Sequence, residues 1–122
     1  MLVKLALPLI SQDMLLYEIQ KLYLQENEYI KRGSRLLDFK AQMTNDFAHD
    51  CPSINFYRIV SQESFWVRKI LVAPREQVNP NHLVAILSAD EYESLEDFGS
   101  ITKVLKITYA GIVHEVDWFG LG

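Results

Sequence analysis

The stretch TNDFAHDCP, residues 44–52, holds the side chains of this chain that are best suited to chemistry. Asp46, His49, Asp50 and Cys51 could bind a metal ion or place a thiolate beside an imidazole. Asp46 and His49 are three residues apart and would share a helix face, whereas Asp50 would not. The competing interpretation is a polar helix end, where histidine is favourable beside the negative end of the helix dipole. We follow the second interpretation, which predicts no metal and no cofactor.

The remaining histidines give weaker indications of a site. His114 and Asp117 are three residues apart, but His114 is expected beside apolar neighbours at the edge of the core. His82 follows a loop rich in Asn and Pro, where it could contact a ligand or be solvated. The chain contains no G-x-G-x-x-G, G-x-x-x-x-G-K, C-x-x-C, H-E-x-x-H or G-x-S-x-G motif. We therefore predict a protein without catalytic function.

Length and composition predict one globular domain over residues 1–122. The chain has 122 residues, of which 49% are hydrophobic and 11% aromatic, and this is enough for a packed core. The single cysteine favours a reducing compartment. The N-terminal MLVKLALPLI has the outline of a signal peptide, but SQD follows without a small-residue cleavage site. Charged residues interrupt the longest apolar run, so we expect a soluble cytoplasmic protein.

The first half of the chain predicts two helices after a short strand. Residues 3–10 read as a strand at a sheet edge, because they contain Pro8. Apolar residues then recur at spacings of three and four, the period of an amphipathic helix: Leu15, Ile19, Leu22 and Tyr23. The same period resumes at Ile30. We expect helices over residues 12–27 and 28–49, either as a hairpin or as one kinked helix.

The middle of the chain predicts strands. From Ile54 the apolar period changes to two, with Phe56 and Val60 on the face expected to be buried. Residues 54–60 and 65–73 read as a hairpin around a polar turn at 61–64. A further short strand is expected over residues 83–87.

A helix over residues 89–98 is predicted from a capping box. Ser88 to Glu91 reads S-A-D-E, in which the serine oxygen would accept from the Glu91 amide and the glutamate would reach back. Leu87 and Tyr92 have the spacing of a hydrophobic staple, and Gly99 could close the helix. The fourteen residues VAILSADEYESLED also resemble the strand-to-helix stretch of Phd/YefM-type antitoxins. The capping box accounts for the same residues, so the chain is not assigned to that family.

The C-terminal third reads as a final hairpin around Ala110-Gly111, with a longer glycine-bulge turn as the alternative. The expected order of elements is β-α-α-β-β-β-α-β-β, without the regular alternation of a doubly wound sheet. This order predicts an α+β domain with a mostly antiparallel sheet and helices packed on one face. No internal repeat is apparent in the sequence.

The charge pattern predicts a binding surface. The formal net charge is −4, and five of the eight residues from 90 to 97 are acidic. If the expected helix and hairpin are neighbours, a negative surface would steer a basic protein partner toward the chain. Its residues would be Glu93, Glu96, Asp97, Glu115 and Asp117. We expect a small non-catalytic protein-binding module in the manner of an immunity protein, antitoxin or adaptor. The alternative is that the acidic residues form a solvated helix face that only keeps the protein soluble.

Two other functions stay open. The basic and aromatic hairpin over residues 54–75 could bind nucleic acid, or act as a small nuclease, through four cations: Arg58, Arg68, Lys69 and Arg75. Against this, alternation places Phe56 and Phe65 in the core rather than on a stacking surface. The aromatic C-terminus, WFGLG, could instead mediate self-association or cover its own core.

Overall fold

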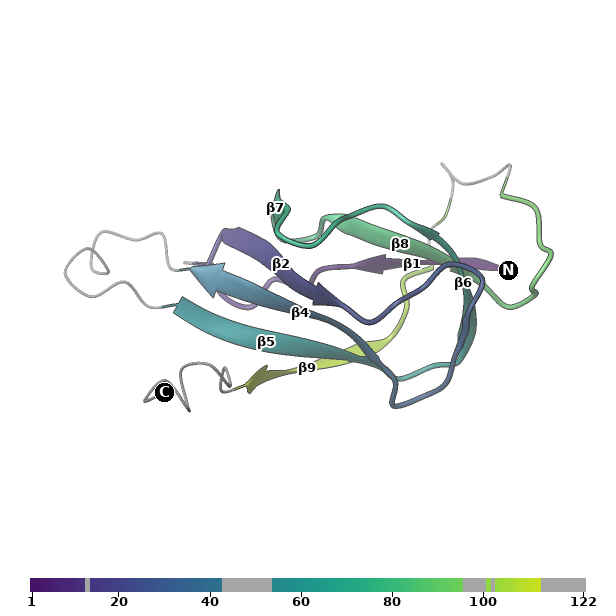
Figure 1. Ribbon diagram of the computed structural model, residues 1–122, viewed down its shortest axis with the longest axis horizontal. Coiled ribbons are helices and arrows are strands. Elements are labelled where there is room, and N and C mark those ends of the chain that lie inside the picture. Colours follow the sequence, from purple (N-terminus) through teal and green to yellow (C-terminus); the bar gives the residue numbers. More distant parts are fainter. Residues whose placement is uncertain (13, 43–53, 96–100, 102, 113–122) are drawn as a thin grey trace.

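The computed structural model describes residues 1–12, 14–42, 54–95, 101 and 103–112. These residues form two antiparallel β-sheets packed face to face, and none of them is helical (Figure 1). The four-stranded sheet has the order β1 (Leu2–Ala6), β8 (Leu83–Ser88), β6 (Phe65–Ile70) and β3 (Tyr29–Ile30). The five-stranded sheet has the order β7 (Gln77–Val78), β2 (Leu16–Leu22), β4 (Arg35–Gln42), β5 (Ile54–Ser61) and β9 (Ile107–Ile112). The α+β prediction is therefore wrong.

The helices expected over residues 12–27 and 28–49 are wrong, and in the first of them a β-bulge interrupts the strand period of two. Strand β2 buries Tyr17 and Ile19 at the strand spacing of two. The pairing of β2 with β4 then shifts between Ile19 and Lys21, so that the next inward side chains are Leu22 and Leu24. Inward positions thus follow spacings of two, three and two. Residues 43–49 of the second expected helix lie outside the described residues.

The expected helix over residues 89–98 is also wrong. The described part, residues 89–95, consists of bends, turns and irregular chain, and residues 96–98 lie outside it. Instead of capping a helix, the Ser88 hydroxyl donates to the carbonyl oxygen of Asp90 and accepts a hydrogen bond from Arg68 at 3.2 Å. The same residues therefore make a local turn at the end of β8, because serine bonds backbone groups equally well outside a helix.

The two expected hairpins are wrong, although the strands expected over residues 54–60 and 65–73 exist in large part as β5 and β6. Strands β5 and β6 lie in different sheets, and the turn at 61–64 carries the chain from one sheet to the other. The buried residues of β5 are Ile59 and Ser61, on the face opposite to the one expected. Ala110 and Gly111 do not form a turn but lie within β9, opposite Arg58 and Tyr57. The strand expected over residues 83–87 is confirmed as β8, and β1 is an edge strand as predicted.

The fold contains an internal repeat that the sequence analysis missed. The segment from β2 to β4 repeats as β6 to β8 at an offset of 48 residues: YEIQKLYL from residue 17 corresponds to FWVRKILV from residue 65. The bulge between Ile19 and Lys21 recurs between Val67 and Lys69. Between the segments 26–39 and 74–87, the only identical pair is Glu28 and Glu76, so the repeat is visible in geometry rather than in residue identity.

The two halves interlock around an approximate twofold relationship. Strand β3 of the first half pairs with β6, while β7 of the second half pairs with β2, in matching registers. The hydrogen bond from the Val67 amide to the Glu28 carbonyl, 2.8 Å, has its counterpart from Ile19 to Glu76, 3.0 Å. Each half therefore contributes one short strand to the sheet that contains the other two strands of its counterpart.

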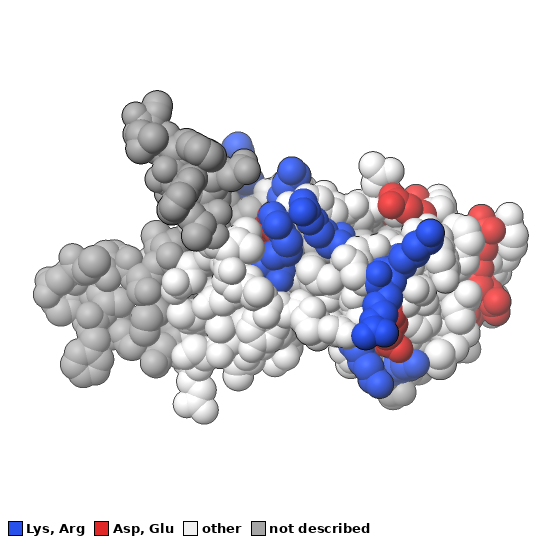
Figure 2. Space-filling model, turned by 90° about the horizontal axis from the view of Figure 1, so that it is seen from below, with Lys and Arg blue, Asp and Glu red and all other residues white. Residues whose placement is uncertain are grey.

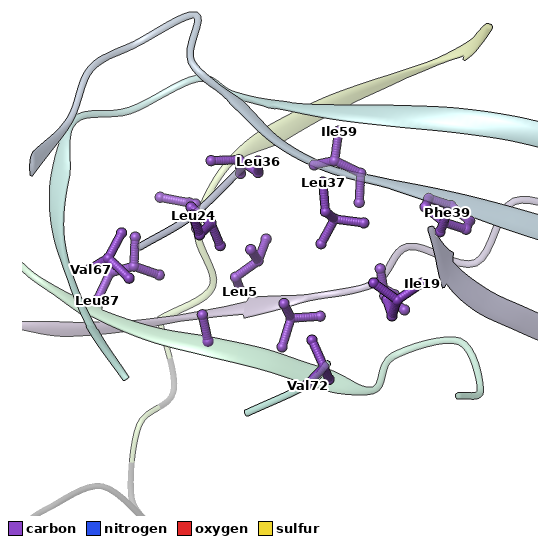
Figure 3. Packing of buried hydrophobic residues seen from close by; sticks show 14 of the residues in the cluster. Leu5, Ile19, Leu24, Leu36, Leu37, Phe39, Ile59, Val67, Val72 and Leu87 are labelled. Carbon is purple, nitrogen blue, oxygen red and sulfur yellow. The ribbon is translucent and has the colours of Figure 1, made fainter. Parts of the chain in front are cut away.

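The core lies between the two sheets (Figure 3). Leu5 and Leu87 of the four-stranded sheet and Leu37, Phe39 and Ile59 of the five-stranded sheet are no more than 1% exposed. Burial of each such side chain stabilises the fold by about 1.5–3 kcal/mol. This apolar layer is the main force that holds the sheets together.

The last described segment closes one side of the core. It runs first along β1. There the Lys4 amide donates to the Lys103 carbonyl at 3.0 Å, and the Leu105 amide donates to the Lys4 carbonyl at 2.8 Å. Leu105 is 2% exposed. The chain then passes to the other sheet and pairs with β5 as β9. The segment before β9 is thus hydrogen-bonded to β1, and β9 itself is paired with β5. Strand β9 forms the outer edge of the five-stranded sheet.

Candidate functional site

The outer edge of β9 is the most accessible strand edge that the described residues present. Strand β9 pairs with β5 on one side, and no described strand pairs with its other side. Its four central residues, Thr108 to Gly111, are exposed, and Tyr109 retains 44% of its surface. An unpaired edge offers backbone donors and acceptors to another strand.

The register shows which backbone groups point outward. The Gln62 amide donates to the carbonyl of Lys106 at 2.9 Å, so these opposite residues form a hydrogen-bonded pair. In an antiparallel ladder, hydrogen-bonded and non-hydrogen-bonded pairs alternate. Continuing the register assigns the β5-facing groups to Thr108, Ala110 and Ile112. The outward N–H and C=O groups then belong to Ile107, Tyr109 and Gly111.

A row of aromatic rings supports β9 from inside the sheet. Tyr17 and Phe39 lie 4.8 Å apart between ring centroids, Phe39 and Tyr57 lie 5.6 Å apart, and Tyr57 meets Tyr109 edge-on at 6.3 Å. The row runs from the fully buried Tyr17 to the exposed Tyr109. Burial raises the pKa of Tyr17, whose hydroxyl donates to the Pro8 carbonyl at 2.8 Å. Strand β9 is therefore held on a rigid base.

Basic side chains gather at the start of β9. Two segments, residues 31–35 and 103–106, carry them, and we call their five cations the basic end: Lys31, Arg32, Arg35, Lys103 and Lys106. Figure 2 views the molecule from the side on which β9 lies in Figure 1 and shows blue side chains crossing this side. Glu63 lies among them, 3.8 Å from the Lys103 ammonium, and also accepts the Lys106 amide at 3.0 Å. The basic end therefore carries more positive than negative charge.

The structure separates the cations proposed for nucleic-acid binding. Arg58 lies on the five-stranded sheet, whereas Arg68 and Lys69 lie on β6 of the other sheet. Arg68 donates to the Glu93 carbonyl at 2.6 Å and so holds the loop after β8. Arg75 lies in the turn before β7, at the edge opposite to β9. These four residues do not form one surface.

Arg58 is occupied by a cross-strand ion pair. Its guanidinium donates to both oxygens of Asp38, at 2.9 and 3.1 Å, and Tyr23 donates to Asp38 at 2.7 Å. The hydrogen bond to Asp38 raises the pKa of Arg58, and burial together with the Asp38 hydrogen bond raises the pKa of Tyr23. Asp38 is 8% exposed. The cluster joins β4 to β5 and leaves little of Asp38 available to a ligand.

Of the predicted acidic surface, the structure describes one residue. Glu93 pairs with the N-terminal ammonium of Met1, and its side chain is 22% exposed. Glu96, Asp97, Glu115 and Asp117 lie outside the described residues. Glu93 therefore fixes the N-terminus to the loop after β8, and the acidic surface stays a prediction.

The residues singled out for chemistry give no assembled site in the described part of the chain. Asp46, His49, Asp50 and Cys51 lie outside it, as does His114. His82 Nε2 is 4.0 Å from Glu76, with both side chains partly exposed. No group of three or more potential metal ligands occurs among the described residues. A depression beside Tyr17 and Lys40 measures about 50 Å³, well below the roughly 300–1,000 Å³ typical of a ligand site.

Comparison with known protein families, curated proteins and solved structures finds no significant match to the chain. Within the described residues, no helix is long and apolar enough to cross a membrane.

Sequence reasoning missed the β9 edge because it folded residues 101–119 into a hairpin. The available signal was the weakness of Ala-Gly as a two-residue turn, since Asn-Gly or Asp-Gly is favoured there. Read without that turn, ITYAGI is a strand rich in β-branched and aromatic residues.

Proposed function

We propose that this chain is a non-catalytic protein-binding module that receives an extended segment of its partner along the outer edge of β9. The observation that carries the proposal is the exposed edge itself, with the outward backbone groups of Ile107, Tyr109 and Gly111. An added strand would satisfy these groups and extend the five-stranded sheet by one strand.

The energetics predict a modest affinity. Each backbone hydrogen bond contributes a net of about 0.5–1.5 kcal/mol. Three outward residues offer three donors and three acceptors. The summed free energy of these hydrogen bonds is similar to the roughly 4 kcal/mol or more that association costs. Backbone pairing alone thus supports weak, reversible binding, and side-chain contacts must supply any selectivity.

The acidic surface expected from the sequence would require a basic partner. Glu93 is engaged by the N-terminus, and the other four residues lie outside the described part. The surface that supports a protein-binding role among the described residues is the β9 edge.

A titration with a short peptide tests the proposal. The probe is an eight-residue peptide that alternates valine and threonine, followed by amide NMR spectra of the full chain. We expect the largest shifts, together with slower hydrogen exchange, at the amides of residues 107, 109 and 111. Shifts confined to the β1 or β3 edges, or no change at millimolar peptide, would remove β9 as the binding site.

A matched pair of variants at Gly111 isolates the backbone contribution. Gly111→Pro removes an outward donor and leaves the pairing with β5, since proline is tolerated on a strand edge that faces solvent. Gly111→Ala keeps the donor, and an added Cβ would meet nothing closer than 3.9 Å. Binding should be lost in the proline variant and kept in the alanine variant. Equal binding by both variants would contradict pairing at this edge.

A further inference from the structure

We propose that the segment received by β9 is acidic, with Asp or Glu side chains that contact the basic end. This inference rests on the proposed function, because it names the chemistry of the partner at the same edge. It reverses the sign of the partner charge expected from the sequence.

Backbone hydrogen bonds hold the basic end together as one unit. The Gly33 amide donates to the Ser61 carbonyl at 2.7 Å, and the Ser61 amide donates to the Ser34 carbonyl at 2.9 Å. The Arg32 amide donates to the Ser64 hydroxyl at 3.0 Å. The Gln62 amide then connects this pair of turns to Lys106. The five cations are therefore carried by adjoining, mutually bonded segments rather than by separate flexible loops.

The positive charge of this unit is only partly compensated. Among the described residues the one carboxylate that contacts it is Glu63, paired with Lys103. The side chains of Lys31, Arg32, Arg35 and Lys106 are exposed and make no ion pair within the described part of the chain. Exposed pairs contribute about 0.2–1 kcal/mol each. Several pairs together would add selectivity and faster association to the weak backbone pairing.

Two cations of the basic end, Lys103 and Lys106, continue the line of the β9 edge, whereas Arg35 lies on β4, with β5 between it and β9. Lys106 directly precedes Ile107, and Lys103 lies where the chain leaves β1. A strand that pairs with β9 and extends beyond Ile107 would pass these cations. At physiological ionic strength, screening acts over about 8 Å, so carboxylates on that part of the strand would be within range.

The alternation of outward N–H and C=O groups favours a polypeptide over nucleic acid. Phosphate oxygens accept hydrogen bonds but donate none, so a phosphodiester chain would leave the outward carbonyls without donors. The ring of Phe65, which lies under the Lys103 ammonium at 5.6 Å, is 6% exposed and cannot stack on a base.

Three labelled peptides test the inference by fluorescence anisotropy. Each has eight residues and alternates valine with glutamate, threonine or lysine. At 50 mM NaCl we expect the glutamate peptide to bind about tenfold more tightly than the threonine peptide, which is the effect of a few exposed ion pairs, and the lysine peptide to bind least. The advantage should shrink to about twofold or less at 500 mM NaCl.

Lys106→Glu should remove most of the advantage of the glutamate peptide while leaving the threonine peptide unchanged, because Lys106 directly precedes β9. Arg75→Glu is the matched control: it makes the same change of charge at an exposed turn beside β7, the opposite sheet edge, and should preserve the advantage. An equal effect of both variants would indicate general attraction to the chain and overturn the assignment to the basic end.

The remaining outcomes separate this inference from the proposed function. Equal binding of the glutamate and threonine peptides, both abolished by Gly111→Pro, would overturn the acidic partner and leave the β9 edge in place. Binding of no peptide would overturn both. Tighter binding of an eight-nucleotide thymidine strand than of the glutamate peptide would favour nucleic acid and overturn the inference. A dimer in sedimentation that Gly111→Pro abolishes would assign the edge to a second copy and overturn it as well.

Discussion

Asn27 and Arg75, which are 48 residues apart, adopt the same left-handed backbone conformation, with φ angles of 68° and 71°. Each amide donates to the other half of the fold: Asn27 to Val67 at 2.8 Å and Arg75 to Ile19 at 2.6 Å. The equivalence means that one turn geometry is required twice, although asparagine occupies one site and arginine the other.

This equivalence predicts that Arg75→Asn stabilises the fold. Asparagine tolerates the left-handed region, where most other side chains cost roughly 1–2 kcal/mol. The free energy of unfolding, measured in urea, should rise by several tenths to about 1 kcal/mol. A decrease would mean that the arginine side chain contributes more than its backbone conformation costs.

Gly33 allows the complementary prediction. Its φ angle is +91°, and no heavy atom lies within 4 Å of the position of an added Cβ. Gly33→Ala should therefore destabilise the fold by about 1–2 kcal/mol through backbone strain alone. Gly33→Asn should cost less, because the equivalent position, Asn81, has a φ angle of 68°. Equal losses for both substitutions would point to lost packing instead of strain.

The ion pair between Asp38 and Arg58 predicts a non-additive pair of substitutions. Arg58→Met leaves a nearly buried carboxylate with Tyr23 as its hydrogen-bond donor, and this should cost about 1–3 kcal/mol. Asp38→Ile, which installs the residue found at the equivalent Ile86 position, should recover most of that loss when combined with Arg58→Met. Denaturant unfolding of the two single variants and the double variant gives the coupling energy. Additive losses would show that the two side chains act independently.

The buried hydroxyl of Tyr17 predicts lower stability in alkali. Burial raises its pKa above the model-compound value of 10.0, so the unfolded chain loses this proton first as the pH rises. The contribution is complete below about pH 10 and is lost as the pH rises through the higher folded-state pKa. Unfolding free energies between pH 8 and 12 should therefore fall less steeply in Tyr17→Phe than in the unsubstituted chain. Parallel curves would exclude Tyr17 as a source of the dependence.

Amide hydrogen exchange checks the register of β9 directly. Thr108, Ala110 and Ile112, whose backbone groups face β5, should exchange slowly, whereas Ile107, Tyr109 and Gly111 should exchange faster. Ala110→Pro, which removes a donor to β5, should destabilise the fold more than Gly111→Pro does. A reversed pattern of protection would assign the opposite set of groups to the outer edge.

Part of the fold could be predicted from the sequence. The apolar run of β8 and the alternation after Ile54 gave correct strands, because strand-sized segments bounded by turn residues leave little choice. The first half failed because the bulge after Ile19 moved the buried positions onto a helix-like spacing. The loop after β8 failed because Ser88 can bond a turn as readily as a helix end.

The candidate site was less accessible to sequence reasoning. In the sequence, Lys103 and Lys106 are two cations within an acidic C-terminal third. Nothing in the order of residues along the chain indicates that they lie beside the turns at 31–35 and 61–64. The internal repeat leaves almost no identical residues. Its signal is the match of YEIQKLYL with FWVRKILV, in which aromatic and aliphatic positions correspond.

The exchange of β3 and β7 between the sheets makes the two halves mutually dependent for folding. A chain cut within the turn at 61–64 would yield two fragments, each lacking the partner strand that its own sheet requires. Neither fragment should fold alone, and mixing them should restore the native structure by complementation. Removing either half would therefore abolish the whole domain rather than leave a smaller stable one.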